Sequence, residues 1–281
     1  PNAGLVVTPS ATSVCDGSVL TFTVGLSQAG VNYELFDGAT SMSAVVGGNG
    51  ASIVLTSNAF SLPGSPVTIK VVATNASSGC SVDLSDTESI TINALPVVTL
   101  TDSDADDIIC AGSSVTFTGG GASTYQFYVN GLSVQGPGAL ATYVTSSLLN
   151  GDVVTVRGVD GSGCAVTSAG TTITVEPLPA TPAIGGNTSP VCDAAGVDMT
   201  LTSSLVSTGS YVWYKNGVAT GDVGASITLS SSADNGSYRV SLVEGVSLCE
   251  GPQSAAQVVV INDEPNAGLV VTPSATSVCD G

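Results

Sequence analysis

Histidine is absent from this 281-residue chain, and lysine and arginine together number only four. Without histidine the chain cannot build a Ser-His-Asp triad, and without CxxC spacing it also lacks the common zinc sites. The 22 acidic residues give a net charge of −18, which argues against nucleic-acid binding because phosphate contacts need clustered Lys and Arg. We therefore expect neither an enzyme nor a nucleic-acid partner.

Long apolar runs are also missing. No stretch of about 18 apolar residues could cross a membrane as a helix, so we expect no direct membrane insertion. Aromatic residues make up only 5% of the chain, and no segment keeps a helical period. Short alternating strands separated by glycine and proline instead predict an all-β protein.

The two ends of the sequence are identical. Residues 1–17 and residues 265–281 both read PNAGLVVTPSATSVCDG, an offset of 264 residues. Such self-similarity is the sequence signature of a repeat architecture. We interpret the chain as one period of a natural tandem array followed by the start of the next, in preference to an engineered duplication.

Within one period the sequence follows a single template three times. An aromatic strand ends in a tight turn each time, as in NYELFDG, YQFYVNG and YVWYKNG, and Asp-Gly or Asn-Gly there predicts a β-hairpin. Proline closes each unit. We predict immunoglobulin-like β-sandwich domains over 1–95, 96–178 and 179–264, with 265–281 opening the next repeat. Short proline junctions predict a semi-rigid rod with the three sandwiches end to end.

Seven cysteines alternate between two contexts. The opening cysteines (Cys15, Cys110, Cys192 and the copy Cys279) precede an early strand, and the closing cysteines (Cys80, Cys164, Cys249) precede a last strand. Joining each opening cysteine to the next closing one predicts Cys15–Cys80, Cys110–Cys164 and Cys192–Cys249, one disulfide per domain at one pole of each sandwich. Cys279 then pairs outside the chain. Disulfides predict an extracellular or periplasmic location.

The third unit carries two marks of immunoglobulin folds. Asp234-Asn235-Gly236-Ser237-Tyr238 has the D-x-G-x-Y pattern of a tyrosine corner. Trp213 lies on the aromatic strand where such folds keep a core tryptophan. Both features support the sandwich prediction.

The segments ICAGSSVTFTGGGASTYQFYVNG and NGDVVTVRGVDGSGCAV resemble the Ig-like or PKD-like repeats of giant Bacteroidota surface proteins. Those include gliding-motility adhesins exported by the type IX system. The resemblance covers all three units and is clearest in 97–179. It implies a bacterial cell-surface filament for adhesion or motility, whose partners are neighbouring repeats of the same chain.

One acidic cluster precedes Cys110. Its D-x-D-x-D spacing is typical of calcium loops, because carboxylate oxygens at alternate positions can surround one ion. The EF-hand glycine and glutamate are missing, so a solvated acidic loop is the competing interpretation. If Cys110 pairs with Cys164, a further aspartate joins the cluster. The candidate calcium ligands are Asp102, Asp104, Asp106, Asp107 and Asp160.

Three functional hypotheses remain at this point. The first is a structural filament or adhesin stalk, which the repetition, the stiff junctions and the disulfides favour. The second is a module that binds carbohydrates or surfaces, which the few aromatics disfavour. The third is a self-assembling fibre in which residues 265–281 complete the next subunit.

Overall fold

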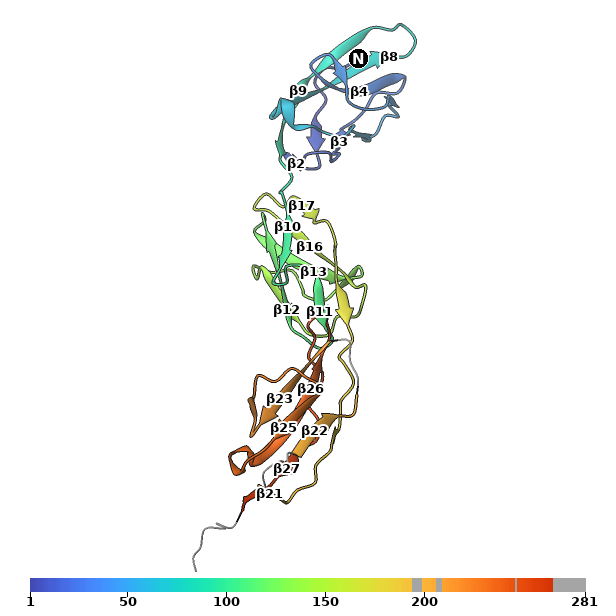
Figure 1. The fold of residues 1–281 in the computed structure, drawn as a ribbon. Helices are drawn as coiled ribbons and strands as arrows, with labels where there is room; N and C mark the ends of the chain where they lie inside the picture. The colour runs from blue at the N-terminus through green and yellow to red at the C-terminus, as the bar shows by residue number, and fades with distance from the viewer. Residues whose placement is uncertain (194–198, 206–208, 246, 265–281) are drawn as a thin grey trace, which may run out of the picture. The chain divides into compact units, whose positions relative to one another are not determined.

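The computed structural model describes residues 1–193, 199–205, 209–245 and 247–264 (Figure 1). Cys279 and the rest of the repeated 17-residue segment lie outside the described residues. The chain forms two compact units: residues 1–103, 116–144 and 153–172 in one, and 104–115, 145–152 and 173 onward in the other. The predicted all-β class and its tandem immunoglobulin-like β-sandwiches are confirmed.

The first sandwich belongs to the first unit and has two sheets. The smaller sheet has the order β1 (Val7–Pro9), β3 (Thr21–Val24) and β7 (Ile53–Thr56). The larger has the order β2 (Ser13–Cys15), β9 (Ser81–Asn93), β8 (Val67–Asn75), β4 (Val31–Asp37) and β5 (Thr40–Ser41), with β6 (Val46–Gly47) also on β4. A short 3₁₀ turn, η1, spans Leu62–Gly64.

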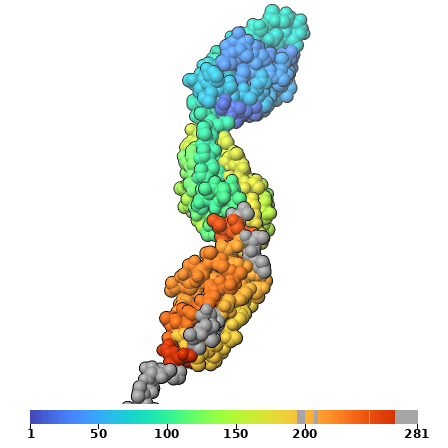
Figure 2. Space-filling model, viewed as in Figure 1, coloured from blue at the N-terminus to red at the C-terminus, as the bar shows by residue number. Residues whose placement is uncertain are grey.

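Alternation along these strands creates the core of the first sandwich. In β4, Val31, Tyr33 and Leu35 are buried while the residues between them are only partly covered. Phe22 from β3 meets this layer from the facing sheet as part of one continuous apolar cluster. The period of two therefore places one face of each strand inward. The space-filling view shows one face of this first segment, which is coloured from blue to cyan (Figure 2).

The second sandwich uses residues 99–176. One sheet has the order β10 (Thr99–Asp102), β12 (Val115–Gly120) and β15 (Thr142–Thr145). Another has the order β14 (Leu132–Ser133), β13 (Thr124–Val129), β16 (Val153–Val159) and β17 (Ala165–Thr167), with β18 (Thr171–Thr172) also on β16. In the second unit, β11 (Ile108–Cys110) pairs with β19 (Thr174–Glu176).

The third sandwich belongs to the second unit. One sheet has the order β20 (Ile184–Gly185), β22 (Met199–Ser203) and β25 (Ser226–Leu229). Another has the order β24 (Val218–Ala219), β23 (Ser210–Lys215), β26 (Gly236–Val243) and β27 (Gln257–Val259). The strand β21 (Val191–Asp193) pairs with β28 (Ile261–Asp263), and η2 spans Ser232–Asp234.

The predicted hairpin turns form at all three aromatic strands. In the second and third sandwiches Asn130-Gly131 and Asn216-Gly217 are the two loop residues, and all four have positive φ. In the first sandwich Asp37 instead pairs with Thr40, so the loop shifts by one residue and begins at Gly38, whose φ is 57°. Glycine allows this shift because positive φ costs it little.

No helix in the described ranges is long and apolar enough to span a membrane.

Candidate functional site

The opening cysteines share one structural position. Each lies at the end of a short strand, or one residue before it, and that strand pairs in parallel with the last strand of its sandwich. Cys15 registers with Asn93, Cys110 with Glu176, and Cys192 with Asn262. These positions follow from the sequence template, because each opening segment precedes the same core strand.

The closing cysteines share a second position, the tight turn before the last stretch of strand. A backbone N–H at the start of the turn donates to the carbonyl of the closing cysteine in all three sandwiches. The hydrogen bonds are Asn75 N to Cys80 O at 2.9 Å, Asp160 N to Cys164 O at 2.9 Å, and Glu244 N to Cys249 O at 3.0 Å. The three closing cysteines therefore share this backbone hydrogen bond.

The two positions lie at opposite ends of the first sandwich. Cys80 directly precedes β9, whereas Cys15 registers with Asn93, the last residue of β9. That strand has 13 residues, so at about 3.3 Å per residue its ends lie roughly 40 Å apart. A disulfide requires Cα atoms within about 7 Å of each other. The predicted Cys15–Cys80 bridge is therefore wrong.

The disulfides instead join one sandwich to the next. Cys15 is bonded to Cys164 with a Cα–Cα distance of 5.6 Å, and Cys110 to Cys249 with a Cα–Cα distance of 5.5 Å. The predicted Cys110–Cys164 and Cys192–Cys249 pairs are also wrong. Cys80 and Cys192 are free thiols, and both are exposed.

Each disulfide bypasses one linker between sandwiches. The Cys15–Cys164 bond spans the linker 94–98 between β9 and β10, and the Cys110–Cys249 bond spans the linker 177–183 between β19 and β20. The bridged closing cysteines are almost fully buried, with 0% of Cys164 and 1% of Cys249 exposed. The linker itself packs closely at the second junction, because a Cβ added to Gly251 would lie 2.6 Å from the Pro179 carbonyl oxygen.

Side chains near the closing cysteines stabilise their turns. Asp160 Oδ1 accepts hydrogen bonds from the backbone N–H groups of Ser162 and Cys164, both at 2.9 Å. In the third sandwich Glu250 accepts from Ser241 Oγ at 2.6 Å and from Tyr214 Oη at 2.5 Å. The hydrogen bond to Glu250 and burial raise the pKa of Tyr214 above its ordinary value.

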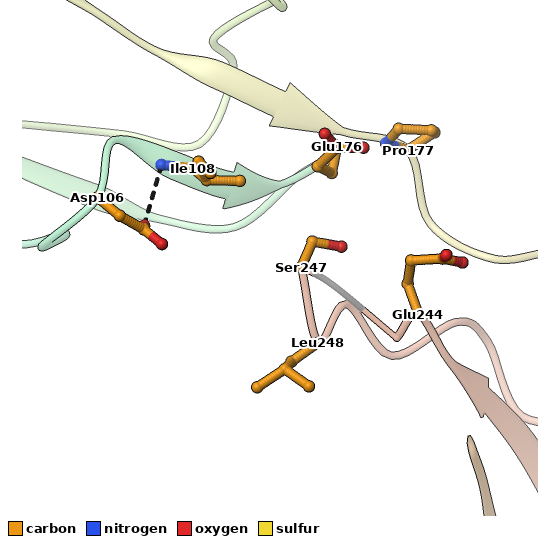
Figure 3. A pocket seen from close by; sticks show the side chains of 7 residues that line it. All are labelled: Asp106, Ile108, Glu176, Pro177, Glu244, Ser247 and Leu248. Atoms are coloured by element: carbon orange, nitrogen blue, oxygen red, sulfur yellow. Dashed lines mark hydrogen bonds between the residues drawn. The ribbon is translucent and has the colours of Figure 1, made fainter. Parts of the chain in front are cut away.

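A hollow of about 490 Å³ lies in the second unit close to the Cys110–Cys249 bond (Figure 3). Its polar groups are mainly carboxylates, which disfavours an anionic ligand. Figure 3 shows Asp106 just before β11, where its Oδ1 accepts a hydrogen bond from Ile108 N at 3.3 Å. The hollow is lined by Asp106, Ile108, Glu176, Pro177, Glu244, Ser247 and Leu248.

The predicted calcium ligands do not gather in the structure. Among the described residues, no group of three or more acidic, cysteine or histidine side chains is arranged to hold a metal ion. Asp104 accepts from Asp106 N at 3.3 Å, and hydrogen bonds from the Asp106 side chain and from nearby backbone N–H groups hold the pKa of Asp104 below its ordinary value. Asp160 was expected beside Asp102 and Asp107 only if Cys110 paired with Cys164, and that bond does not form. Calcium binding stays an untested prediction.

The third sandwich contains the predicted immunoglobulin marks. Tyr238 Oη donates to the Asp234 carbonyl oxygen at 2.7 Å, which is a tyrosine corner. Burial, and then the negative charges of Asp234 and Asp222, raise the pKa of Tyr238 to about 12. Trp213 is fully buried and donates through Nε1 to the Gly224 carbonyl oxygen at 2.8 Å.

Comparison with known proteins identifies no family: no protein-family model and no curated protein matches the chain. Solved structures with similar folds include an I-band fragment from titin, at 13% identity and a TM-score of 0.39, covering 93% of this chain and 98% of that one. Fibronectin(III)-like modules of Clostridium thermocellum CbhA match at 14% identity and a TM-score of 0.35, covering 61% of this chain and 95% of that one. An ICAM-5 ectodomain fragment matches at 15% identity and a TM-score of 0.35, covering 91% and 76%.

The sequence contained one signal against pairing within a domain. The segment SVDLSDTESITIN, directly after Cys80, forms a single strand over 81–93. A strand of that length between closing turn and sandwich end excludes the local bond.

Proposed function

We propose that this chain is a structural repeat unit of an extracellular surface filament or adhesin stalk, which extends from a bacterial cell for adhesion or gliding motility. The observation that carries the proposal is the pair of disulfides that bypass the linkers between sandwiches. An extracellular location agrees with them, because disulfides persist in oxidising compartments.

The two disulfides overlap along the sequence, and this overlap suits a stalk under tension. The loop closed by Cys15–Cys164 and the loop closed by Cys110–Cys249 share residues 110–164. A covalent path therefore runs from Cys15 to Cys164, back along the second sandwich to Cys110, and on to Cys249. This path avoids both linkers, so tension reaches the third sandwich even if both linkers are cut.

The carbohydrate-binding alternative has little support among the side chains. None of the 13 aromatic residues is classed as exposed, and most are core residues such as Phe22, Tyr33 and Trp213. Binding modules for sugars or surfaces generally present aromatic faces to their ligand. Because the aromatic side chains pack in the cores instead of facing solvent, the structural role is favoured over carbohydrate binding.

In a self-assembling fibre, the donor segment would have to compete with an identical segment that is already in place in the first sandwich. Residues 1–17, identical to the proposed donor segment, already supply β1 and β2 to the first sandwich. Val7 registers with Val24 and Cys15 with Asn93, so an incoming copy would have to displace an existing strand. A continuous tandem array needs no such displacement.

The test cuts both linkers in the oxidised protein. Recognition sites for a sequence-specific protease are inserted between Leu95 and Pro96 and between Ala180 and Thr181, and the protein is tethered by its two ends in a force instrument. We expect the cut molecule to hold tension until a reductant is added. The same insertions with Cys15→Ser and Cys110→Ser should release the tether on cutting.

Two results would contradict the proposal. If the tether is released when the linkers of the oxidised protein are cut, with all cysteines present, the linkers alone carry the load. Specific binding of the protein to a glycan array would favour the carbohydrate-binding module instead.

A further inference from the structure

The two free cysteines are the unmatched members of the pairing pattern. Each disulfide joins an opening cysteine to the closing cysteine of the following sandwich. Under that rule the first sandwich has a closing cysteine, Cys80, with no preceding partner, and the third has an opening cysteine, Cys192, with no following partner. We propose that Cys192 of one 264-residue repeat forms a disulfide with Cys80 of the next repeat.

Cys80 has the same local geometry as the closing cysteines that are bridged. Its carbonyl accepts from Asn75 N at 2.9 Å, as those of Cys164 and Cys249 accept in their own turns. Asn75 Oδ1 also accepts from the backbone of Ser77 at 3.0 Å, as Asp160 does from Ser162. The Cys80 turn is thus formed before any partner binds it.

Cys192 lies on the same kind of strand as the opening cysteines that are bridged. It is one residue before the end of β21, and β21 pairs in parallel with β28 as the strand of Cys15 pairs with β9 and that of Cys110 with β19. Its thiol is exposed, as a site awaiting a partner requires.

The closing cysteines differ in their exposure. Cys164 and Cys249 are buried, whereas Cys80 is exposed. The Cys80 thiol is therefore accessible to a cysteine of another sandwich.

The repeated segment identifies that sandwich. Residues 265–281 repeat the first 17 residues of the first sandwich directly after the third, so in the proposed array a third sandwich is followed by a copy of a first one. Opening and closing cysteines therefore keep alternating across the repeat boundary, where Cys192 is followed by the copy of Cys80. The result is an unbroken series of overlapping disulfides along the array.

The bond forms by thiol–disulfide exchange with a small or protein disulfide as oxidant. The Cys192 thiolate attacks the oxidant, which releases one thiol and leaves a mixed disulfide on Cys192. The Cys80 thiolate of the next repeat attacks the Cys192 sulfur and releases the second thiol. Two cysteine thiols are oxidised, one disulfide is reduced, and their two protons end on the released thiols.

The test uses two copies of residues 1–264 in tandem, oxidised with a glutathione buffer and digested without reduction. Cleavage after Asp and Glu leaves Cys80 on 38–83 but keeps Cys164 and Cys192 together on 161–193, because the Glu176–Pro177 bond resists cleavage; thermolysin, which cuts before Ile173, then separates these two cysteines. We expect mass spectrometry to find the Cys80 and Cys192 peptides joined. Cys80→Ser in the second copy should abolish the joined peptide, and Cys80→Ser in the first copy should leave it intact.

Two outcomes would overturn the inference. Cys192 of the first copy and Cys80 of the second could both remain open to alkylation while Cys15–Cys164 and Cys110–Cys249 form. Alternatively, the joined peptide could survive Cys80→Ser in the second copy, which would place the bond within one repeat. The inference deepens the stalk proposal and rests on it, yet either outcome leaves the cut-linker test unaffected, because that test depends only on the other two bonds.

Discussion

The Cys80 and Cys164 turns have the same backbone hydrogen bond, yet Cys164 is fully buried in a disulfide and Cys80 is an exposed thiol. The comparison separates two causes. The sandwich alone forms the turn, because Cys80 keeps it without a bond. The burial of Cys164 comes from what lies against the turn. The disulfide therefore locks a junction between sandwiches and is not needed to shape a sandwich.

Alkylation of the native, unreduced protein is the largest contrast that this comparison predicts. Cys80 and Cys192 should react completely with iodoacetamide, because both are exposed free thiols. Cys15 and Cys164 should not react until a reductant is added, because they are bonded. Peptide mass spectrometry measures both, and equal labelling of Cys80 and Cys164 would remove the distinction.

Substitution of the two closing cysteines should have unequal effects on stability. Cys164→Ser opens a bridge across 149 residues, which in the chain-entropy model lowers the free energy of unfolding by roughly 4–5 kcal/mol. Cys80→Ser alters an exposed thiol, so we expect a change within about 0.5 kcal/mol. Denaturant unfolding under non-reducing conditions measures both variants, and equal midpoints would contradict the account.

Packing at the second junction is tested by Gly251→Ala. The added methyl group would lie 2.6 Å from the Pro179 carbonyl oxygen, so we expect a loss of roughly 1–3 kcal/mol from overpacking. Gly161→Ala is the matched control in the closing turn of the second sandwich, where a Cβ meets no atom within 4 Å. Thermal unfolding should separate the two variants; a control as unstable as Gly251→Ala would argue against a specific contact.

Tyr238→Phe should have the smallest effect on stability. It tests the fold inside one sandwich, away from the disulfides. Loss of the hydrogen bond to Asp234 should cost about 1 kcal/mol at neutral pH. Because the folded pKa of Tyr238 is raised to about 12, its protonated hydroxyl stabilises the fold below pH ~10, and that contribution is lost as the pH rises toward ~12.

Tyrosinate absorbance provides the measurement for this pH dependence. The wild-type protein should show a late-titrating tyrosine that is missing from Tyr238→Phe. If the variant keeps that late component, the high pKa belongs to another tyrosine and the assignment to the tyrosine corner fails.

Local features were predictable from the sequence because they depend on neighbouring residues. The Asn130-Gly131 and Asn216-Gly217 turns, the buried Trp213 and the Tyr238 corner follow from short patterns whose physical requirements are local. The shift of the first hairpin to Gly38 shows the limit of such patterns, since strand register chooses between adjacent loop residues.

The disulfide pairing was not predictable by the same reasoning. Proximity in sequence favoured Cys15–Cys80, but the length of β9 places these two residues at opposite ends of the sandwich. The true partner of Cys15 is 149 residues away. Asp160 was likewise placed with the other candidate calcium ligands through a Cys110–Cys164 bond that does not form.

The central claim is that disulfides link successive sandwiches, and non-reducing peptide mapping of the oxidised 281-residue protein tests it most directly. Cleavage after Asp and Glu leaves Cys15 on 1–16, Cys80 on 38–83 and Cys164 on 161–193, because the Glu176–Pro177 bond resists cleavage. The account predicts that peptide 1–16 is joined to 161–193. A species in which 1–16 is joined to 38–83 would contradict it and would restore the disulfide within the first domain.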